Sequence, residues 1–414
     1  MTTTIDFDRL WIKDYPDLGT GPVSTEPCIS AEYFEAERER VFSKVWLKAG
    51  RVEQLPNPGD YFVLDIAICR ASVILVRGND GALRAFHNVC MHRGNKLIWD
   101  HEKTGNLRSF SCRFHGWSFA LDGSVRAVPD EKMFYSLDKD NCGLRPVALD
   151  QWEGFLFINL DSQPKETLKA FLGDLGEHLS GYPYAEHSTC YSYRAELNAN
   201  WKVCLDAFSE AYHVLMVHGQ TVGQANFSRE NPMSHCFDVQ LYERHRRAVV
   251  YGNPKFQPSP TGKVAAQFGY TSTVRGRGMD TLPPQINPER RPEYNFNLCA
   301  IFPNFMIHVR PGEYFTHQFW PLDHNRTIWE GRNYLPPAKN AGERFSQEYS
   351  HTVRRNAWLE DTSAMEATHA GLSTGALRDF QLSDPEILVR HGYKVLEDYV
   401  GFFRERTARA GAAR

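Results

Sequence analysis

Between Gly59 and Leu160, apolar residues occur in short β-branched and aromatic runs that are separated by turn sequences. Such runs predict β-strands, and the sequences Gly-Asn-Asp-Gly at 78–81 and Asp-Gly at 122–123 supply hairpin turns. We therefore expect strands over residues 61–66, 72–77, 117–121, 124–128 and 155–160.

Apolar residues with a helical period precede and follow this strand-rich region. Ser30 is a candidate N-cap, and Phe34, Val41 and Val45 form one stripe, which predicts a helix over residues 31–48. Residues 251–292 are rich in Pro and poor in apolar residues, so we expect a long loop of the kind that covers binding sites. Further helices are expected over 168–178, 201–217 and 341–369, with a last one starting at 383–385, and further strands over 191–197, 297–309, 313–321 and 327–334.

This order of elements predicts an α+β protein with two domains and an N-terminal extension. We expect an N-terminal segment and helix over residues 1–40 that pack on the second domain. Residues 41–162 should form a small β-rich domain. Residues 163–414 should form a larger domain with a curved antiparallel sheet and long helices.

The composition narrows the class of protein. The 414 residues carry 47 Lys and Arg against 50 Asp and Glu, a formal charge of −3, which argues against nucleic acid as a partner. No apolar run approaches the roughly 18 residues of a membrane span, and the N-terminus does not resemble a secretory signal. We expect a cytoplasmic protein. The 9 Cys are odd in number and scattered, which does not fit a disulfide framework, whereas 16 His raise the question of metal.

Two Cys/His pairs answer part of that question. Cys90 and His92 form C-x-H, and Cys112 and His115 form C-x2-H, with each pair in a loop after a strand. Two thiolates and two imidazoles suit either Zn²⁺ or an iron–sulfur cluster of the Rieske type, in which Cys holds one iron and His the other. Structural zinc usually groups its Cys together and its His together. The alternation within each pair therefore favours a Rieske [2Fe–2S] cluster over zinc.

A second set of candidate ligands lies near the end of the helix expected over 201–217. His213 and His218 are five residues apart, so their side chains converge only if the helix ends or distorts between them, and Gly219 marks such an ending. Two imidazoles and one carboxylate form the facial triad of mononuclear Fe(II) oxygenases. Asp361, late in the long helix, is our choice for the carboxylate. We expect the neighbouring acids Glu360 and Glu366 to be solvated or paired.

These motifs resemble the α subunit of Rieske non-heme iron oxygenases, the terminal components of multicomponent oxygenase systems. The resemblance covers nearly the whole chain. The two Cys/His pairs, Asn-Trp-Lys at 200–202, an acid three residues before the first His of Tyr-His-x4-His, and a late Glu-Asp occur in the family's order. The resemblance implies that the second domain has the helix-grip fold. It also implies a ligand set for each cofactor. The [2Fe–2S] cluster would be held by Cys90, His92, Cys112 and His115. The mononuclear Fe(II) would be held by His213, His218 and Asp361.

The resemblance further implies how electrons arrive. The chain has no dinucleotide-binding motif, so electrons from NAD(P)H should come through a separate reductase, with a ferredoxin as a possible intermediary. In the family, an acid links the iron His of one subunit to a cluster His of its neighbour. Glu210 occupies that position here, where Asp is typical of ring dihydroxylases. Asp206, one turn earlier, should line the pocket or support a ligand. We expect a homotrimer (α3), with α3β3 not excluded.

The substrate and the product are less determined by sequence. The expected pocket is mostly apolar, which suits an aromatic or other apolar small molecule and an origin in aromatic hydrocarbon catabolism. Its candidate residues are Ala207, Val214, Leu215, Phe302, Phe305, His308 and His317. The short chain and the Glu at the bridge favour monooxygenation, including oxidative N- or O-dealkylation, over ring cis-dihydroxylation. A non-catalytic Rieske electron carrier and a ligand-binding helix-grip protein are alternatives of another class.

Overall fold

The structure, a computed structural model, describes residues 6, 8–269 and 279–412. The chain divides into two compact units. One unit consists of Arg38–Phe171, and the other combines Met1–Glu37 with Leu172–Arg414. The division falls within helix α3 (Leu168–Leu179), next to Gly173, whose positive φ of 49° interrupts the helix.

The smaller unit is built from β-strands. A seven-stranded antiparallel sheet has the order β2-β11-β10-β5-β4-β3-β6, and a separate three-stranded sheet has the order β7-β8-β9. The strands are β2 (Leu47–Arg51), β3 (Asp60–Ile66), β4 (Ala71–Arg77), β5 (Leu83–His87), β6 (Thr104–Asn106), β7 (Phe110–Ser111), β8 (Ser118–Phe119), β9 (Val125–Ala127), β10 (Pro146–Trp152) and β11 (Phe155–Asn159). One hydrophobic cluster contains Cys90 and Cys112 together with Trp117 and Phe119, so both thiols are enclosed by this unit's core.

The helix expected over residues 31–48 is wrong in its second half. Helix α2 covers Ala31–Glu37, a π-helical turn follows at Arg38–Phe42, and Leu47–Arg51 is strand β2. The reason is tertiary: Leu47 pairs with Ile158 of β11, and a sheet partner more than a hundred residues away leaves no signal in local periodicity.

The larger unit is organised around a second antiparallel sheet, with the order β12-β18-β17-β16-β15-β14-β13. Its strands are β12 (Thr189–Leu197), β13 (Phe237–Leu241), β14 (Arg246–Tyr251), β15 (Tyr294–Ile301), β16 (Phe305–Arg310), β17 (Glu313–Asp323) and β18 (Arg326–Leu335). A short pair, β1 (Val23–Ser24) and β19 (Asp379–Phe380), joins the N-terminal segment to the C-terminal part of the same unit.

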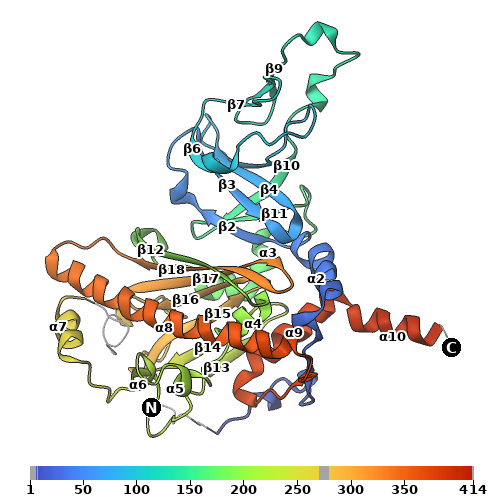
Figure 1. Ribbon diagram of the computed structural model, residues 1–414. Coiled ribbons are helices and arrows are strands. Elements are labelled where there is room, and N and C mark those ends of the chain that lie inside the picture. The colour runs from blue at the N-terminus through green and yellow to red at the C-terminus, as the bar shows by residue number, and fades with distance from the viewer. Residues whose placement is uncertain (1–5, 7, 270–278, 413–414) are drawn as a thin grey trace. The chain divides into compact units, whose positions relative to one another are not determined.

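Helices cover one face of this sheet. Figure 1 shows the longest, α8 (Ala341–Ser373), running across the strands, with α4 and α9 beside it. The α-helices of the unit are α1 (Glu26–Ile29), α2, the part of α3 after Phe171, α4 (Trp201–Asp206), α5 (Val214–Val217), α6 (Gly223–Asn226), α7 (Pro260–Phe268), α8, α9 (Ile387–Val400) and α10 (Phe402–Ala412). The expected class, α+β with a small β-rich domain and a helix-grip domain, is confirmed.

Three further expectations for this unit need correction. The strand expected over 297–309 is two strands, β15 and β16, because Ile301 pairs with Phe305 across a tight turn that contains Pro303 and Asn304. The loop expected over 251–292 contains helix α7, which Ser259 caps by accepting a hydrogen bond from the Gly262 N–H. Part of that loop, residues 270–278, lies outside the described residues. Strands β13 and β14 had no counterpart among the expected elements.

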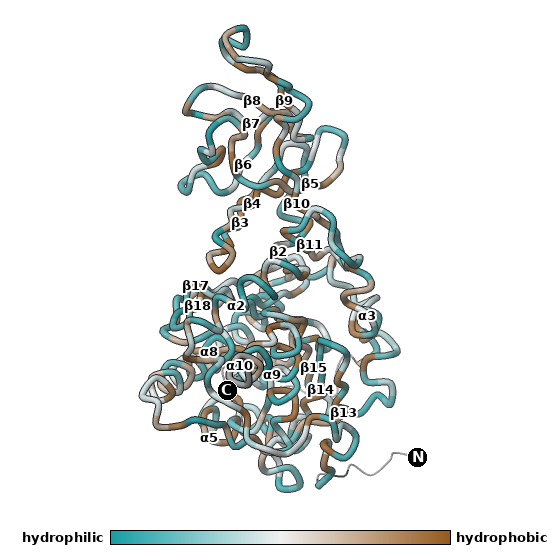
Figure 2. Tube along the Cα trace, turned by 90° about the vertical axis from the view of Figure 1, so that its right-hand side faces the viewer, coloured by the Kyte–Doolittle hydropathy of each residue, from teal (hydrophilic) through white to brown (hydrophobic). Residues whose placement is uncertain are grey.

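None of the described helices is long and apolar enough to cross a bilayer. Figure 2 shows hydrophobic and hydrophilic residues interspersed along the trace of both units.

Candidate active site

The segment between α4 and α5 positions the two candidate histidines. Asn200 caps α4 by accepting a hydrogen bond from the Lys202 N–H at 3.0 Å, and the helix ends at Asp206 instead of continuing to residue 217. The Glu210 carboxylate accepts hydrogen bonds from the backbone N–H groups of Tyr212 and His213, and so supports a turn before α5 begins. His213 and His218 are the residues before and after the short helix α5, and their side chains face the same point.

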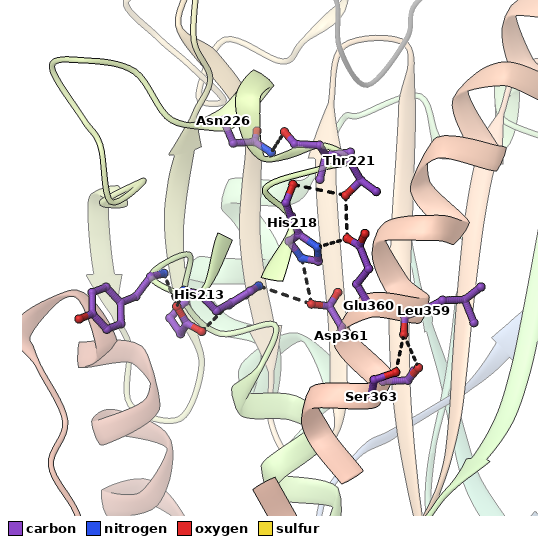
Figure 3. A network of polar contacts seen from close by, with 12 residues as sticks. His213, His218, Thr221, Asn226, Leu359, Glu360, Asp361 and Ser363 are labelled. Atoms are coloured by element: carbon purple, nitrogen blue, oxygen red, sulfur yellow. Dashed lines mark hydrogen bonds and ion pairs between the residues drawn. The ribbon is translucent and has the colours of Figure 1, made fainter. Parts of the chain in front are cut away.

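His213, His218 and Asp361 come together as one group. Asp361 Oδ1 lies 2.9 Å from His218 Nε2 and 3.5 Å from His213 Nε2. One ligand atom from each of the three side chains fits within a span of 4.8 Å. Figure 3 shows the two imidazoles from the 213–218 segment pointing at Asp361 of helix α8. Two neutral imidazoles and a carboxylate on one side of a point are the ligands of a mononuclear Fe(II) centre that keeps open positions, so the donor set fits that ion.

Each histidine is held by a second carboxylate on its other ring nitrogen. Glu210 Oε1 lies 2.5 Å from His213 Nδ1, and Glu360 Oε2 lies 2.7 Å from His218 Nδ1. Glu360 Oε2 also accepts a hydrogen bond from the Thr221 hydroxyl at 2.7 Å (Figure 3). A carboxylate at Nδ1 orients the ring and leaves Nε2 free to bind metal.

Glu360 is the residue whose role sequence reasoning did not assign. It was expected to be solvated or paired, and it is paired with a candidate ligand. The only signal in the sequence was its place next to Asp361. Glu366, in contrast, accepts hydrogen bonds from the backbone and side chain of Asn198, away from the histidines.

The carboxylates also determine the electrostatics of the group. Burial opposes protonation of His213 and His218, but the hydrogen bonds and charges of Glu210, Asp361 and Glu360 outweigh it and raise the pKa of both imidazoles. The same negative charge favours a bound divalent cation.

A cavity of about 120 Å³ opens beside the three candidate ligands. It lies between helix α8, the 207–226 segment and one face of the sheet, where Val250 pairs with Phe296 and Leu298 pairs with His308. The wall is mostly apolar, and the polar side chains that line it away from the ligands are Asn226, Asn295, His308, Arg310 and Arg354. Of the expected pocket residues, Ala207, Val214 and His308 line this cavity.

The other expected pocket residues lie elsewhere. Phe302 and Asp206 line a separate small cavity. Asp206 also lines a third cavity, of about 280 Å³, which reaches Glu210, His213 and Asp361 from the side of α9. His317 is fully buried behind Phe208, with the two rings stacked at 3.9 Å, and Phe305 is buried in the core. Leu215 is half-buried on α5 and is not among the lining residues.

The Cys/His loops of the smaller unit repeat one backbone pattern. The Cys90 N–H donates to the Asn95 carbonyl and the Cys112 N–H donates to the Trp117 carbonyl. In each loop the N–H of the glycine four residues after the Cys donates a hydrogen bond to the Cys carbonyl. These glycines are Gly94, with φ of 79°, and Gly116, with φ of 75°. Positive φ favours glycine at these positions. The two loops are therefore built alike.

The side chains of the loops form a site with thiols inside and imidazoles outside. Cys90 and Cys112 are buried, and each thiol affects the pKa of the other; the centroids of the His92 and His115 rings lie 4.7 Å apart near the surface. The backbone N–H groups of His92 and Phe114 favour the thiolate forms of Cys90 and Cys112 respectively by lowering the pKa, and the Asn95 side-chain amide donates a hydrogen bond to Cys112 Sγ at 3.7 Å. Two thiolates and two imidazoles with backbone donors to sulfur fit a Rieske cluster.

Sequence comparison places both units in known families. Residues 45–141 match the Rieske [2Fe-2S] domain, and residues 185–401, more than half of the chain, match the ring hydroxylating alpha subunit catalytic domain. The chain belongs to the ring-hydroxylating oxygenase alpha subunits. It is therefore the terminal oxygenase of a Rieske system, an oxidoreductase that incorporates O₂ and uses a [2Fe–2S] cluster and a mononuclear iron. The resemblance seen in the sequence motifs is confirmed.

Relatives of this alpha subunit include oxygenases of two kinds. The large oxygenase component of a naphthalene 1,2-dioxygenase system from Pseudomonas aeruginosa is 36% identical over 359 residues, which covers 78% of this chain and 73% of the relative. The oxygenase subunit of a carnitine monooxygenase from Escherichia coli (strain K12) is 34% identical over 186 residues, which covers 45% of this chain and 49% of the relative. Oxygenase components of this type receive electrons from separate protein partners.

Solved structures share the fold. A quaternary ammonium Rieske monooxygenase has a TM-score of 0.71 at 21% identity, with 91% of this chain and 95% of the other covered. Naphthalene 1,2-dioxygenase from Rhodococcus sp., bound to indole, has a TM-score of 0.73 at 20% identity, with 94% and 96% covered.

Proposed function

We propose that this oxygenase hydroxylates a small, largely apolar organic molecule, as a monooxygenase whose reactions include removal of N- or O-alkyl groups. The observation that carries the proposal is the position of His213, His218 and Asp361 in the wall of the 120 Å³ cavity. That volume is close to the roughly 150 Å³ of an apolar cavity that binds benzene, so a single ring is the expected size of the substrate body.

Within the part of the chain that the structure describes, each cofactor has a set of candidate ligands. We assign the mononuclear Fe(II) to His213, His218 and Asp361, within a catalytic domain over residues 163–414 on which residues 1–40 pack. We assign the [2Fe–2S] cluster to Cys90, His92, Cys112 and His115, within a Rieske domain over residues 41–162. When bound, the cluster supplies electrons and the iron supplies the redox chemistry that activates O₂.

The residues around the iron ligands position the reaction. Glu210 and Glu360 hold the Nδ1 atoms of the two histidines, and so direct both Nε2 atoms to one point. The apolar side chains Val250, Phe296 and Phe315 exclude water and present the substrate body to that point. Glu210 is also the candidate link to the cluster histidine of a neighbouring subunit. Asp206, which accepts a hydrogen bond from the Tyr393 hydroxyl at 2.8 Å, supports the segment that carries Glu210.

Ring cis-dihydroxylation is the second candidate, and the naphthalene 1,2-dioxygenase relative at 36% identity favours it. The two candidates differ in their products. The purified oxygenase, supplied with a reductase, a ferredoxin and ¹⁸O₂, should be assayed on single-ring arenes and on their N-methyl and O-methyl derivatives. One labelled oxygen in a phenol, or formaldehyde from a methyl group, supports monooxygenation. Two labelled oxygens in a cis-diol overturn it.

Metal analysis separates these activities from a non-catalytic role. An active oxygenase should hold about three irons and two labile sulfides per chain, because one iron is additional to the cluster. An electron carrier would lack the additional iron, and a ligand-binding helix-grip protein would lack the cluster. Retention of only zinc, without sulfide, would contradict both the oxygenase and the electron carrier, because each of these needs the [2Fe–2S] cluster.

The partners and the compartment follow from the same chemistry. We propose a separate reductase and a ferredoxin as electron donors, and a homotrimer in which Glu210 faces a neighbouring subunit. One structural relative is described in terms of inter-subunit electron transfer, which supports that arrangement. None of the nine Cys, all of which the structure describes, forms a disulfide, which supports a reducing cytoplasm. Light scattering on the purified protein gives the number of chains directly.

A further inference from the structure

The cavity beside the iron ligands has a charged end. Arg354 of helix α8 and Arg310 of strand β16 line it, and both are buried, with 7% and 4% of their surface exposed. A buried guanidinium is costly unless acidic groups compensate for it. The acidic residues that line the same cavity, among those the structure describes, are Glu210 and Asp361, and both belong to the iron end.

One carboxylate serves both arginines. Glu313 is 1% exposed, and its Oε1 accepts a hydrogen bond from Arg354 Nη2 and lies 3.4 Å from Arg310 Nε. Arg310 and Glu313 are paired across the tight hairpin between β16 and β17, so local sequence brings them together. Among the described residues, two guanidinium groups and one carboxylate therefore meet at this end of the cavity, and the formal charge of these three side chains is +1.

Polar atoms at this end also lack protein partners. Within the described residues, Arg354 Nε and both ring nitrogens of His308 have no hydrogen-bond partner, although His308 is 98% buried. Burial and the charge of Arg354 lower the pKa of His308 to about 3, so the ring is neutral and one of its nitrogens donates. Burial lowers the pKa of Arg354 to about 10, which leaves it cationic near neutral pH. Buried donors of this kind normally have a partner, and a ligand can supply it.

Helix α8 runs along the cavity and connects its arginine end with its iron-ligand end. Arg354, Ala357, Trp358 and Asp361 all line the cavity, which is the spacing of one helix face. Seven residues of helix separate Arg354 from Asp361, a rise of about 10 Å. A single aromatic ring with one substituent spans a distance of that order. The apolar wall between the ends includes Phe315, whose ring lies 4.1 Å from the Arg354 guanidinium carbon.

We propose that the substrate of this oxygenase carries a carboxylate, which binds at Arg354, Arg310 and His308 while the rest of the molecule extends toward His213, His218 and Asp361. The inference rests on the proposed function, because it names the substrate class of the same cavity. An arginine binds a carboxylate through two parallel N–H donors, and such charge-assisted hydrogen bonds are the strong ones. The anion neutralises the excess charge and gives the unpartnered donors an acceptor.

The test compares nearly isosteric pairs in the iron-loaded, cluster-loaded protein. Benzoate and benzamide, and 4-methoxybenzoate and 4-methoxybenzamide, differ in charge but hardly in shape. Titration calorimetry should show that at least one carboxylate binds about tenfold or more tightly than its amide, as expected for hydrogen bonds to a charged group. Equal or weaker binding of the carboxylate in both pairs overturns the inference.

Variants assign the preference to the arginine. Arg354→Gln should weaken carboxylate binding about tenfold and change amide binding less than about threefold. Arg355→Gln is the matched control, because Arg355 is the next residue on α8 and hydrogen-bonds Asn356 outside the cavity. Arg354→Lys keeps the charge beside Glu313 and should keep a preference for the carboxylate even if the Gln variant does not fold. A Gln variant that prefers carboxylate as strongly as the native protein contradicts the assignment.

Turnover separates this inference from the proposed function. If carboxylates bind preferentially and ¹⁸O appears in their products, both stand. If carboxylates bind preferentially but no compound gains oxygen in the reconstituted system, the subsite is supported and the oxygenase function fails. If neutral arenes gain oxygen and carboxylates neither bind nor react, the function stands and the subsite is overturned.

Discussion

Glu360 Oε2 lies 2.7 Å from His218 Nδ1 and accepts a hydrogen bond from it, while Oδ1 of the next residue, Asp361, lies 2.9 Å from Nε2 of the same ring. Two consecutive residues of one helix therefore hold opposite edges of a single imidazole. The Thr221 hydroxyl donates to the same Glu360 oxygen, which restricts that carboxylate to one position. Glu360 thus orients a candidate ligand without occupying a coordination position.

Removing Glu360 should weaken the mononuclear iron site. Loss of a partner that orients a metal-ligating histidine typically costs about 10- to 100-fold in metal affinity. We expect Glu360→Ala to lose one iron per chain to a chelator at a correspondingly lower concentration, and Glu360→Gln, which keeps an acceptor oxygen, to be less affected. Labile sulfide should not change in either variant.

Glu366→Ala is the control for Glu360. Glu366 lies on the same helix, but it accepts hydrogen bonds from Asn198 and does not contact His218. Iron retention in Glu366→Ala should equal that of the native protein. Equal retention in Glu360→Ala would show that the hydrogen bond to His218 does not support the site.

Replacement of Glu210 should lower turnover without emptying either metal site. Glu210→Gln keeps an oxygen beside His213 Nδ1, so ligand orientation is preserved, but it removes the negative charge of the proposed link to a neighbouring subunit. We expect iron and sulfide contents to be native and product formation to fall at least about tenfold, a loss of roughly 1.4 kcal/mol in transition-state terms. Glu243→Gln, at an exposed position, is the control. Native turnover in Glu210→Gln would make the bridging role wrong.

A substitution at one metal site should remove the iron of that site and leave the other site loaded. Asp361→Ala should remove about one iron per chain and leave sulfide unchanged, whereas Cys112→Ser should remove about two irons together with the sulfide. Inductively coupled plasma analysis and a labile-sulfide assay measure both. Loss of sulfide in Asp361→Ala, or its retention in Cys112→Ser, would contradict the ligand assignment.

Asp206 makes stability depend on pH. Burial raises the pKa of its carboxyl to about 7, despite the Tyr393 hydrogen bond and the charges of Arg246 and Lys202, which lower it. The folded protein therefore binds this proton more tightly than the unfolded chain, whose Asp pKa is about 3.9. Because the folded state holds more protons between these values, the free energy of unfolding decreases as the pH rises from about 4 to about 7.

Asp206→Asn should remove that dependence. At pH 5 the native carboxyl is mostly protonated, so the variant and the native protein should have similar thermal midpoints. At pH 8 the native carboxylate is ionised in a partly buried position, so the variant should unfold at the higher temperature, by an effect of a few kcal/mol at most. The exposed Asp379→Asn is the control. If the thermal midpoints of Asp206→Asn and the native protein differed by the same amount at pH 5 and pH 8, the raised pKa of Asp206 would be contradicted.

The motifs that identify the family could be predicted because metal ligation needs particular side chains at short spacings. Cys90 with His92, Cys112 with His115, and His213 with His218 each lie within one loop or turn, so each pair is visible in a few residues of sequence. Helix geometry also predicted that a helix ends between His213 and His218, and α5 does end at Val217, but the expected helix over 201–217 has a second break after Asp206, before the turn that the Glu210 carboxylate supports.

Elements that depend on distant partners were not predictable. Strand β2 exists because Leu47 pairs with Ile158, and β14 joins its sheet by pairing with β15, where Arg246 lies opposite Ala300. Local periodicity describes one element at a time, and strand formation depends on pairing and burial that it does not contain. The expected pocket residues show the same limit: His308 lines the cavity, whereas His317 on the neighbouring strand is packed behind Phe208.

The sequence by itself determined the family, the two cofactors and the side chains with which we expect the chain to hold them, because these rest on residue type and short spacing. Tertiary structure alone decided which groups surround them. Glu360 meets His218 across 142 positions through the packing of α8 on α5, and Arg354 meets Glu313 across 41 positions through the packing of α8 on the sheet. Those contacts place two cations and one anion at the far end of the cavity. Their excess charge is a property of that packing and of no single motif.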